Sequence, residues 1–560
     1  YLAGLAQGTP GWLVHIARDE GRMASLAEGI GFFAPGTHVL KLPAWDSLPY
    51  DRVSPNPEIC ASRMNTLARL VGQPPPKAPS ILLTTVNASL QRLPPRHSIS
   101  GAAFQAGLGA TVEVAALLEF LVRNGYSRSG TVMEPGEFAT RGGIVDIFPA
   151  GAETPVRLDF FGDTLDSVRL FDPLTQITIG EGKSVDLVPA SEVQLTEDST
   201  ARFRQGYRDL FGAVTDDDPL YLSISEGRRH AGMEHWLPLF HDELETVFDY
   251  VGEAVITLDH LCLEARDDRL AQIEDYYQAR IEAQAHPYGT APSYKPVPPE
   301  TLFLDAKAWE GALGERPGGI FSPFAAPEGA QVIDFAGRQG RSFAAERAQA
   351  GVNVFEVLRD HVNEQRRLGR RVVFAAFSQG SAERMALLLH DHDIEGVRAA
   401  KHWPEVMALP AAVSAIVVLG LEQGVETPGL AIISEQDVLG DRLARRRRSK
   451  RAEQFLTEQS QLSQGDLVVH VEHGIGRYEG LETIEVGGGS HDCLEIHYHG
   501  NDKLFLPAEN IELLSRYGSE DAGVALDRLG GAAWQARKAR LKQHIRDMAD
   551  QLIKVAAERV

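Results

Sequence analysis

The sequence has very few cysteines, three among 560 residues. Cys60, Cys262 and Cys493 lie far apart and form no CxxC pair, which excludes a disulfide framework and a cysteine-based zinc site and predicts a reducing, cytoplasmic location. No apolar run reaches the ~18 residues that a membrane-spanning helix requires, so we expect no membrane partner. The chain begins at Tyr1 without a leader sequence, and a start lost upstream is the simplest interpretation.

Motifs for nucleotide chemistry are also missing. The pattern GxxxxGK[ST], whose backbone cradles phosphates, occurs nowhere, and the glycine-rich residues 4–11 lack its Lys-Ser/Thr ending. HGIGRYEG (473–480) has the wrong spacing for a dinucleotide fingerprint, and FSQGS (377–381) lacks the GxSxG of a nucleophile elbow. The five histidines between 470 and 499 have no metal-ligand spacing. The sequence therefore predicts no catalytic residue, no metal site and no cofactor in this chain.

Basic residues are outnumbered by acidic ones, 55 Lys and Arg against 77 Asp and Glu, so the net charge is −22. A compact protein that binds DNA without sequence preference is expected to be basic, so protein partners are favoured. The exception is DRLARRRRSKRAEQ (441–454), which contains Arg445, Arg446, Arg447 and Arg448. Such a run is either a solvated helix or linker, or a phosphate contact or interdomain clamp.

What the sequence does contain is a conspicuous hairpin pattern. Apolar and polar residues alternate through VRLDFF (156–161) and again from Leu165 to Phe171, with Gly162-Asp163 between them. This pattern predicts an antiparallel hairpin with one solvated face, since glycine supplies the positive φ of the turn. Exposed arginine and aromatic side chains on such a face are typical of protein-docking surfaces.

Arg157, Arg169 and Phe171 are the candidate docking residues, but their relative placement depends on the turn. A two-residue turn would put Arg157 beside Val168 and Arg169 on the opposite face. A three-residue turn or a bulge would bring all three candidates together. The alternative to docking is that Phe171 packs inside and the arginines form surface ion pairs of little energetic value.

The same region resembles a known family. GEFATRGGIVDIFP (136–149) and RLDFFGDTLDSVRLFDP (157–173) are similar to UvrB and, more closely, to bacterial transcription-repair coupling factors, as is the stretch from Leu42 to Leu70. The resemblance implies that this domain docks the repair protein UvrA, through Arg157, Arg169 and Phe171. UvrB carries a phosphate loop and an aromatic-rich hairpin. The absence of that loop, and of a Tyr-rich insertion in residues 84–95, favours the coupling factors.

We expect a multidomain chain of α/β and α+β units, because strands and helices alternate in some segments and short strands dominate others. With the resemblance, the predicted domains are a degenerate UvrB-like α/β domain at 1–97, the UvrA-docking hairpin domain at 98–190, a return to the first domain at 191–295, a third α/β domain at 300–438, a basic linker at 439–462, a small β-barrel at 463–518 and a relay helix at 530–560.

The β-barrel prediction rests on short alternating strands punctuated by glycine. The resemblance implies that this domain binds RNA polymerase, with the hairpin at 480–486 adding onto a strand of the polymerase β subunit. Its implied contacts are Leu481, Thr483, Ile484 and Glu485. Strand addition gives affinity through backbone hydrogen bonds, and one apolar side chain, Ile484, would set the register.

The resemblance implies a role in transcription-coupled DNA repair. The intact protein would bind stalled RNA polymerase, displace it as an ATP-driven DNA translocase and recruit UvrA for nucleotide excision repair. ATP, magnesium and double-stranded DNA would belong to a motor that this segment lacks. Two alternatives are a UvrB-type excision-repair helicase with its phosphate loop before Tyr1, and a stand-alone polymerase-binding regulator, which would leave the first 440 residues unexplained.

Overall fold

The computed structural model describes residues 1–72, 78–214, 218–285, 294–314, 316–324, 329, 331–349, 351–440, 465, 467–470, 473–486, 489–500, 502–507, 514–518 and 526–529. The chain divides into two compact units, Tyr1–Gly440 and Asp441–Val560. Within the described ranges, no helix combines the length and the apolar character needed to cross a bilayer.

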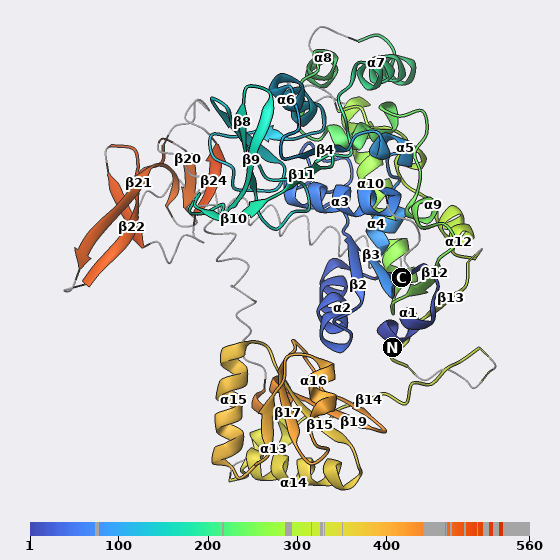
Figure 1. The fold of residues 1–560 in the computed structure, drawn as a ribbon, viewed down its shortest axis with the longest axis vertical. Helices are drawn as coiled ribbons and strands as arrows, with labels where there is room; N and C mark the ends of the chain where they lie inside the picture. The colour runs from blue at the N-terminus through green and yellow to red at the C-terminus, as the bar shows by residue number, and fades with distance from the viewer. Residues whose placement is uncertain are drawn as a thin grey trace. The chain divides into compact units, whose positions relative to one another are not determined.

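The first sheet is parallel throughout, with the strand order β13-β12-β1-β3-β2 (Figure 1). Its central strands β1 and β3 are buried along their whole length because both faces of the sheet are covered. The strands are β1 (Trp12–Ala17), β2 (His38–Leu42), β3 (Ser80–Thr85), β12 (Val255–Leu258) and β13 (Gly318–Ile320). The predicted parallel sheet is therefore confirmed for the start of the chain.

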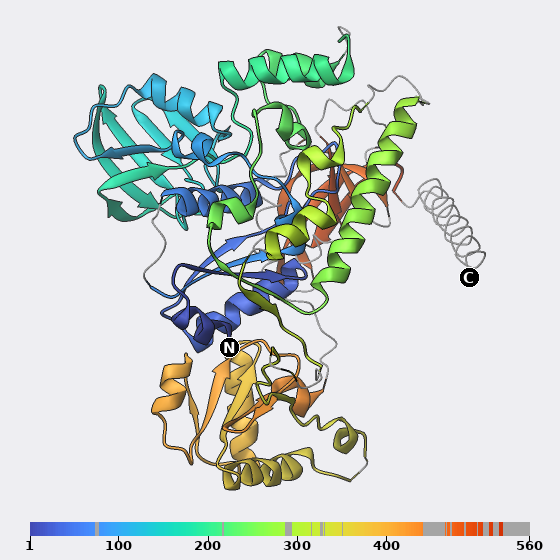
Figure 2. The same cartoon turned by 90° about the vertical axis from the view of Figure 1, so that its right-hand side faces the viewer.

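Helices cover both faces of this sheet. Val14 and Ile16 of β1 face one core, and Leu13 and Ala17 face the other, as strand alternation requires. The long helix α10 (Cys262–Ala285) runs beside the sheet in Figure 2. The other helices of this region are α1 (Leu2–Gly8), α2 (Glu20–Phe33), α3 (Pro57–Gly72), α4 (Val86–Leu90), α5 (Arg96–Ser100), α9 (Val247–Val251), α11 (Pro299–Leu302) and α12 (Ala306–Gly314).

The sheet extends further along the chain than the sequence indicates. Residues 300–320, which the sequence assigns to the third domain, supply α12 and β13 to the first sheet. The close approach of β13 depends on Gly318, where a Cβ atom would lie 1.9 Å from the Ile256 carbonyl oxygen. A three-residue strand joined by such a long-range pairing has no periodicity that a sequence pattern can reveal.

The second sheet forms the hairpin domain. Its order is β10-β9-β8-β7-β6-β5, and helix α6 (Val114–Arg123) packs on its inner face. Its strands are β5 (Ser127–Arg128), β6 (Glu137–Arg141), β7 (Ile144–Ile147), β8 (Val156–Phe161), β9 (Thr164–Phe171) and β10 (Thr178–Gly182). A two-stranded sheet of β4 (Phe104–Gly107) and β11 (Ser184–Leu187) lies in the same core.

The described residues of 197–214 and 218–239 form a helical layer around an aromatic core that contains Phe203, Tyr207 and Trp236. Its elements are α7 (Glu197–Phe211), α8 (Pro219–Ser225) and the 3-10 segment η1 (Met233–Leu239). Tyr50, from the irregular loop after β2, is also buried in this core. The helical layer therefore packs against the loop after β2.

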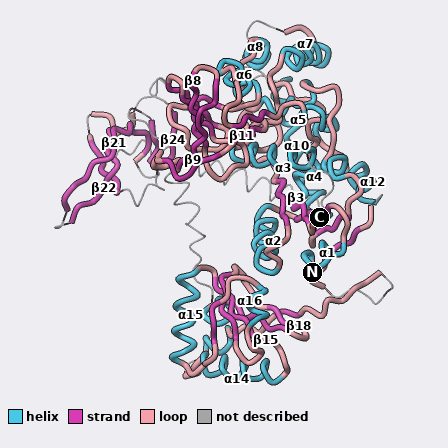
Figure 3. Tube along the Cα trace, viewed as in Figure 1, coloured by secondary structure: helices cyan, strands magenta, loops and turns pink. Residues whose placement is uncertain are grey.

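The third sheet has the order β14-β18-β19-β15-β17-β16, with helices beside its strands (Figure 3). One face packs on α14, α15 and α17, and the other packs on α16 and on Phe32 of α2. Its elements are α13 (Ala344–Ala348), α14 (Val354–Arg367), α15 (Gln379–Asp391), α16 (Trp403–Ala408), α17 (Glu435–Leu439), β14 (Arg338–Gln339), β15 (Arg371–Ala376), β16 (Val397–Ala399), β17 (Ser414–Val418), β18 (Val425–Thr427) and β19 (Leu430–Ser434).

The second unit contains one antiparallel sheet with the order β23-β22-β21-β20-β24. Among the strands that the structure describes, β23 and β24 lie at opposite edges and do not pair, so the predicted β-barrel is corrected to an open sheet. Alternating polarity is the same in open and closed sheets, which explains the error. The strands are β20 (Leu467–His470), β21 (Gly474–Val486), β22 (Gly489–His497), β23 (Lys503–Pro507) and β24 (Leu514–Gly518). The basic segment with Arg445–Arg448 and the predicted relay helix lie outside the described residues.

Candidate protein-docking site

The outer face of the second sheet brings the two candidate arginines together. Arg157 on β8 lies directly opposite Arg169 on β9, in a row that continues to Asp146 on β7 and Glu181 on β10. We call the four residues the charged row. The inward neighbours Leu158 and Val168 pair with each other and are buried in the core. The charged row therefore lies on the opposite face of the sheet, away from α6.

A bulge produces this arrangement. The hairpin turn has two residues, since Phe161 pairs with Thr164 and Gly162 has a φ of +63°. The register then shifts between Asp159 and Phe160, so that one extra residue in β9, Asp166, has no opposite partner. Of the arrangements that the sequence left open, the bulged one, which aligns Arg157 with Arg169, is therefore the one observed.

Arg157 is held rigidly from two sides. Its Nε and one terminal nitrogen donate hydrogen bonds of 2.7 and 2.9 Å to the carboxylate of Asp146, which is only 2% exposed. These hydrogen bonds raise the pKa of the Arg157 guanidinium. The guanidinium carbon also lies 4.8 Å from the ring centroid of Phe171, a cation–π distance. The pair is bidentate, so the guanidinium orientation is fixed before any partner arrives.

Arg169 has a more exposed environment. One terminal nitrogen donates a 3.0 Å hydrogen bond to Asp159, and both side chains are partly open to solvent. Its Nε is buried and has no hydrogen-bond partner within the described part of the chain. Two adjacent guanidiniums repel each other, and the separate carboxylates offset that repulsion. Arg169 is thus the less firmly held of the two arginines.

Phe171 does not contribute to the exposed surface, in line with the alternative in which it packs inside, and its role as a UvrA contact stays a prediction. Its side chain is 0% exposed and packs in a small core with Val132, Ala139 and Phe148. The strand alternation does place Phe171 on the same face as Arg169, but the segments around Val132 and Phe148 cover that end of the face. The buried Phe171 ring therefore contacts the Arg157 guanidinium and helps to fix its position.

The exposed aromatic residue of this hairpin is Phe161, which is not among the predicted docking residues. Its side chain is 85% exposed at the tip of the hairpin, on the outer face like Arg157 and Asp159. Arg141 on β6 is also exposed, in the row that continues through Ile144 to Asp159. The signal for Phe161 was available, because it occupies an outer position directly before the turn glycine.

The domain that carries this face is fixed to the first sheet by a buried ion pair. Arg63 of α3 donates from Nε to Glu192 over 2.5 Å, and both side chains are fully buried. Glu192 also accepts a 2.9 Å hydrogen bond from Trp45, and Arg63 donates to the Pro43 carbonyl. Charges buried this deeply are stable only when they are paired, so the network holds the two parts in one arrangement.

In the second unit, the structure describes the backbone pairing of the predicted polymerase contacts. The long strands β21 and β22 form an antiparallel hairpin. Leu481 pairs with Leu494, Thr483 with Asp492, Ile484 with His491 and Glu485 with Ser490. The side chains of the four predicted contacts lie outside the described part of the structure, so their roles stay predictions.

Comparison with known proteins gives a consistent result along the chain. Residues 105–193 match the family described as UvrB interaction domain, and residues 462–518 match CarD-like/TRCF RID domain. The chain is 32% identical to the transcription-repair-coupling factor of Escherichia coli K12 over 100% of its own length and 48% of that protein. The corresponding values are 30%, 98% and 47% for Rickettsia bellii, and 28%, 93% and 44% for Bacillus subtilis.

The chain is homologous to transcription-repair-coupling factors along nearly its whole length. It spans about half the length of the curated relatives that it matches. The charged row and Phe161 lie within the segment that matches the UvrB interaction domain. Strands β20 to β24 lie within the segment that matches the second family.

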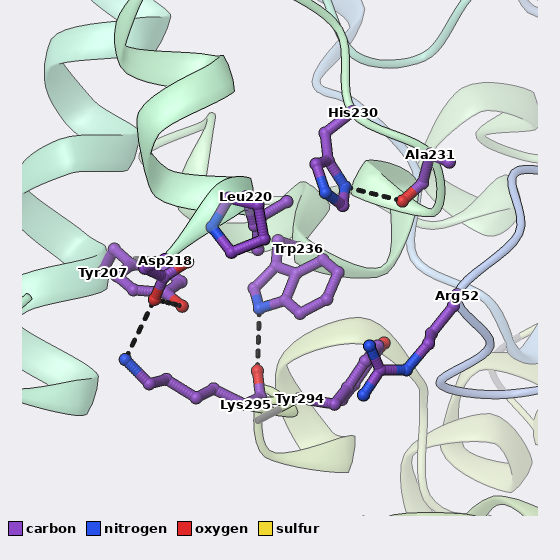
Figure 4. A pocket seen from close by; sticks show the side chains of 10 residues that line it. Arg52, Tyr207, Asp218, Leu220, His230, Ala231, Trp236, Tyr294 and Lys295 are labelled. Atoms are coloured by element: carbon purple, nitrogen blue, oxygen red, sulfur yellow. Dashed lines mark hydrogen bonds and ion pairs between the residues drawn. The ribbon is translucent and has the colours of Figure 1, made fainter. Parts of the chain in front are cut away.

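A small pocket lies outside both matched segments of this coupling-factor homologue. Its volume is about 140 Å³, and Figure 4 shows Trp236, Tyr294 and Leu220 on its walls, with the Lys295–Asp218 ion pair at its side. Small-molecule sites usually have volumes of ~300 Å³ or more, so this pocket is too small for a nucleotide. Within the described ranges, no group of three or more His, Cys, Asp or Glu residues is placed to hold a metal ion.

Proposed function

We propose that this chain is the adaptor portion of a transcription-repair coupling factor and that it recruits UvrA through the outer face of its second sheet. The observation that carries the proposal is the alignment of Arg157 with Arg169 on an exposed face of the domain that matches the UvrB interaction domain. Arg157 and Arg169 supply positive charge, and Phe161 supplies an exposed aromatic anchor. Arginine and aromatic residues are enriched at protein interfaces and dominate their energetics.

The second part of the proposal concerns RNA polymerase. The hairpin of β21 and β22 would add to a strand of the polymerase β subunit, with Leu481, Thr483, Ile484 and Glu485 as contacts. Its match to the CarD-like/TRCF RID family supports this role. Strand addition uses backbone hydrogen bonds for affinity and alternate side chains for specificity.

The remaining activities of the family would reside in another part of a full-length protein. The chain contains no GxxxxGK[ST] motif, so the ATP, magnesium and double-stranded DNA that an ATP-driven translocase needs would bind elsewhere. Arg445–Arg448, which lie outside the described residues, would add a phosphate contact. In this account the chain supplies partner binding in the cytoplasm, and the motor displaces the stalled polymerase.

UvrA binding tests the first part of the proposal. The double variant Arg157→Ala/Arg169→Ala should weaken UvrA binding at least about tenfold, mainly through slower association with a smaller salt dependence. The matched control is Arg123→Ala, which removes an exposed arginine from α6 of the same domain. Equal UvrA affinity of the double variant and the wild type would contradict this docking face.

Polymerase binding tests the second part. Ile484→Arg would place an unpaired charge in the strand interface, which costs several kcal/mol, so binding to RNA polymerase should be lost. Leu387→Arg is the control, because Leu387 is an exposed aliphatic side chain on α15 of the other unit. Polymerase binding that survives Ile484→Arg would remove β21 from the interface.

A further inference from the structure

The turn between β9 and β10, together with the start of β10, exposes three aliphatic side chains that no role described above uses. Leu174 is 64% exposed, Ile177 66% and Ile179 59%. We call these three residues the apolar turn. Single exposed aliphatic residues are common on protein surfaces, but three within six consecutive positions form a concentrated apolar feature of the kind that marks an interaction site.

The apolar turn is held in one conformation by its own polar groups. The Asp172 carboxylate accepts hydrogen bonds from the backbone N–H groups of Leu174 and Thr175 and from the Thr175 hydroxyl. The backbone N–H of Asp172 donates to the Ile177 carbonyl over 2.9 Å and closes the loop. The accepted hydrogen bonds lower the pKa of Asp172, so the carboxylate stays ionised.

Gln176 completes this internal scaffold. Its backbone has a φ of +59°, a left-handed conformation that is uncommon for glutamine. Its side-chain amide donates to the carbonyls of Val132 and Pro173. A loop fixed in this way loses little conformational entropy when a partner covers it, which is an advantage for binding.

The apolar turn adjoins the charged row. Thr178 pairs with Phe171, Ile179 is the extra residue of a second bulge, and Glu181 pairs with Arg169. At ~3.3 Å per residue, the path from Phe161 past Arg157 to the level of Phe171 is roughly 20 Å long. A typical protein interface covers ~800 Å² on each partner, so one partner can cover Phe161, the charged row and the apolar turn together.

A protein that docks on this face would need apolar contacts as its main source of affinity. Arg157 and Arg169 already have carboxylate partners within the chain, so a docked protein gains steering and specificity from them more than affinity. Removal of apolar surface from water is the main source of affinity at protein interfaces. Phe161 supplies apolar surface at one end of the face, and the apolar turn supplies it at the other.

We infer that the apolar turn is the hydrophobic part of the UvrA docking footprint and controls how long the complex lasts. This inference rests on the proposed function and adds contacts to it. The partner surface would present an apolar depression next to acidic groups, which complement the arginines of the charged row. The turn then determines the dissociation rate, and the arginines determine the association rate.

Association and dissociation rates of UvrA on the immobilised full chain test the inference. Ile177→Ser/Ile179→Ser should raise the dissociation rate about tenfold or more and leave the association rate within about twofold. Leu387→Ser is the matched control, because Leu387 is 65% exposed on α15 and should change neither rate. Leu174→Ser should show the same effect as the double variant to a smaller extent, and all three variants should keep the wild-type thermal unfolding midpoint.

The outcomes distinguish a failure of the role of the apolar turn from a failure of the docking face. If Arg157→Ala/Arg169→Ala slows association but the serine variants leave the dissociation rate unchanged, the role of the apolar turn is overturned and the docking face stands. If neither set of variants changes UvrA binding, the docking face fails as well. If the serine variants abolish self-association of the chain without affecting UvrA, the turn is a contact between two copies and the inference is wrong.

Discussion

Arg157 and Arg169 lie side by side on neighbouring strands, yet each forms an ion pair with a different carboxylate. Asp146, the partner of Arg157, is buried, whereas Asp159, the partner of Arg169, is partly exposed. The two ion pairs therefore differ in what their removal costs, and that difference gives a first prediction.

Asp146→Ala should destabilise the second sheet by about 2–4 kcal/mol, because it removes both hydrogen bonds of Arg157 and leaves the guanidinium next to a buried cavity. Asp159→Ala should cost less than about 1 kcal/mol, since its ion pair is partly exposed. Urea unfolding followed by circular dichroism measures both. Equal effects of the two substitutions would show that the burial of Asp146 does not strengthen the pair.

Glu192→Ala should be among the most destabilising single substitutions in the first unit. It would leave Arg63 charged and buried, which costs about 3–5 kcal/mol, and would remove the acceptor of Trp45. The control is Glu119→Ala on α6, whose exposed pair with Arg123 should contribute less than about 0.5 kcal/mol. A near-neutral Glu192→Ala in urea unfolding would contradict the claim that this pair fixes the docking domain to α3.

Two glycines with positive φ should respond differently to alanine. At Gly142 a Cβ atom would meet nothing within 4 Å, so Gly142→Ala should cost only the backbone strain of about 1 kcal/mol. At Gly151 the new atom would lie 2.3 Å from the Cβ of Asn65 on α3, which adds about 1–3 kcal/mol of overpacking. Thermal unfolding of the two variants gives the comparison, and equal midpoints would show that the contact between Gly151 and α3 is loose.

Acid should weaken the first unit through two buried histidines. Burial lowers the pKa of His15 and of His235 to about 4, against an ordinary value of 6.5. The unfolded chain therefore binds more protons than the folded chain between these values, and the free energy of unfolding falls as the pH drops below about 6.5. Each histidine should account for about 2 kcal/mol of the loss between pH 7 and pH 5.

His235→Phe tests the share of one of these groups. The variant should show a smaller loss of stability between pH 7 and pH 5 than the wild type in urea unfolding. His390→Gln is the control, because His390 is exposed on α15. An unchanged pH dependence in His235→Phe would show that His235 can be protonated in the folded protein without loss of stability.

Part of this architecture could be predicted from local pattern. The alternation in residues 156–161 predicts the strand, and its burial pattern in β8 confirms the solvated outer face. The pairing of Arg157 with Arg169 could not be predicted, because it depends on a single bulged residue, Asp166, which changes no periodicity outside the bulge. The burial of Phe171, one of the alternatives that the sequence left open, could not be decided from the pattern, since its cover comes from Val132 and Phe148, which are distant in sequence.

Long-range pairing limits prediction in the same way elsewhere. The return of β12 to the first sheet pairs it with β1, more than 200 positions earlier, and β13 then pairs with β12 across about 60 positions. A pattern of short alternating strands also could not distinguish a closed barrel from the open sheet of β20 to β24. Phe161 is the opposite case, because its outer position directly before the turn glycine already indicates an exposed side chain.

The central claim is that this chain links RNA polymerase to UvrA, and a bridging assay tests it most directly. RNA polymerase is immobilised, the chain is added, and retained UvrA is measured with and without the chain. The account predicts that UvrA is retained only when the chain is present, and that either Ile484→Arg or Arg157→Ala/Arg169→Ala abolishes the retention. Retention of UvrA that is independent of the chain, or no retention in its presence, would contradict the account.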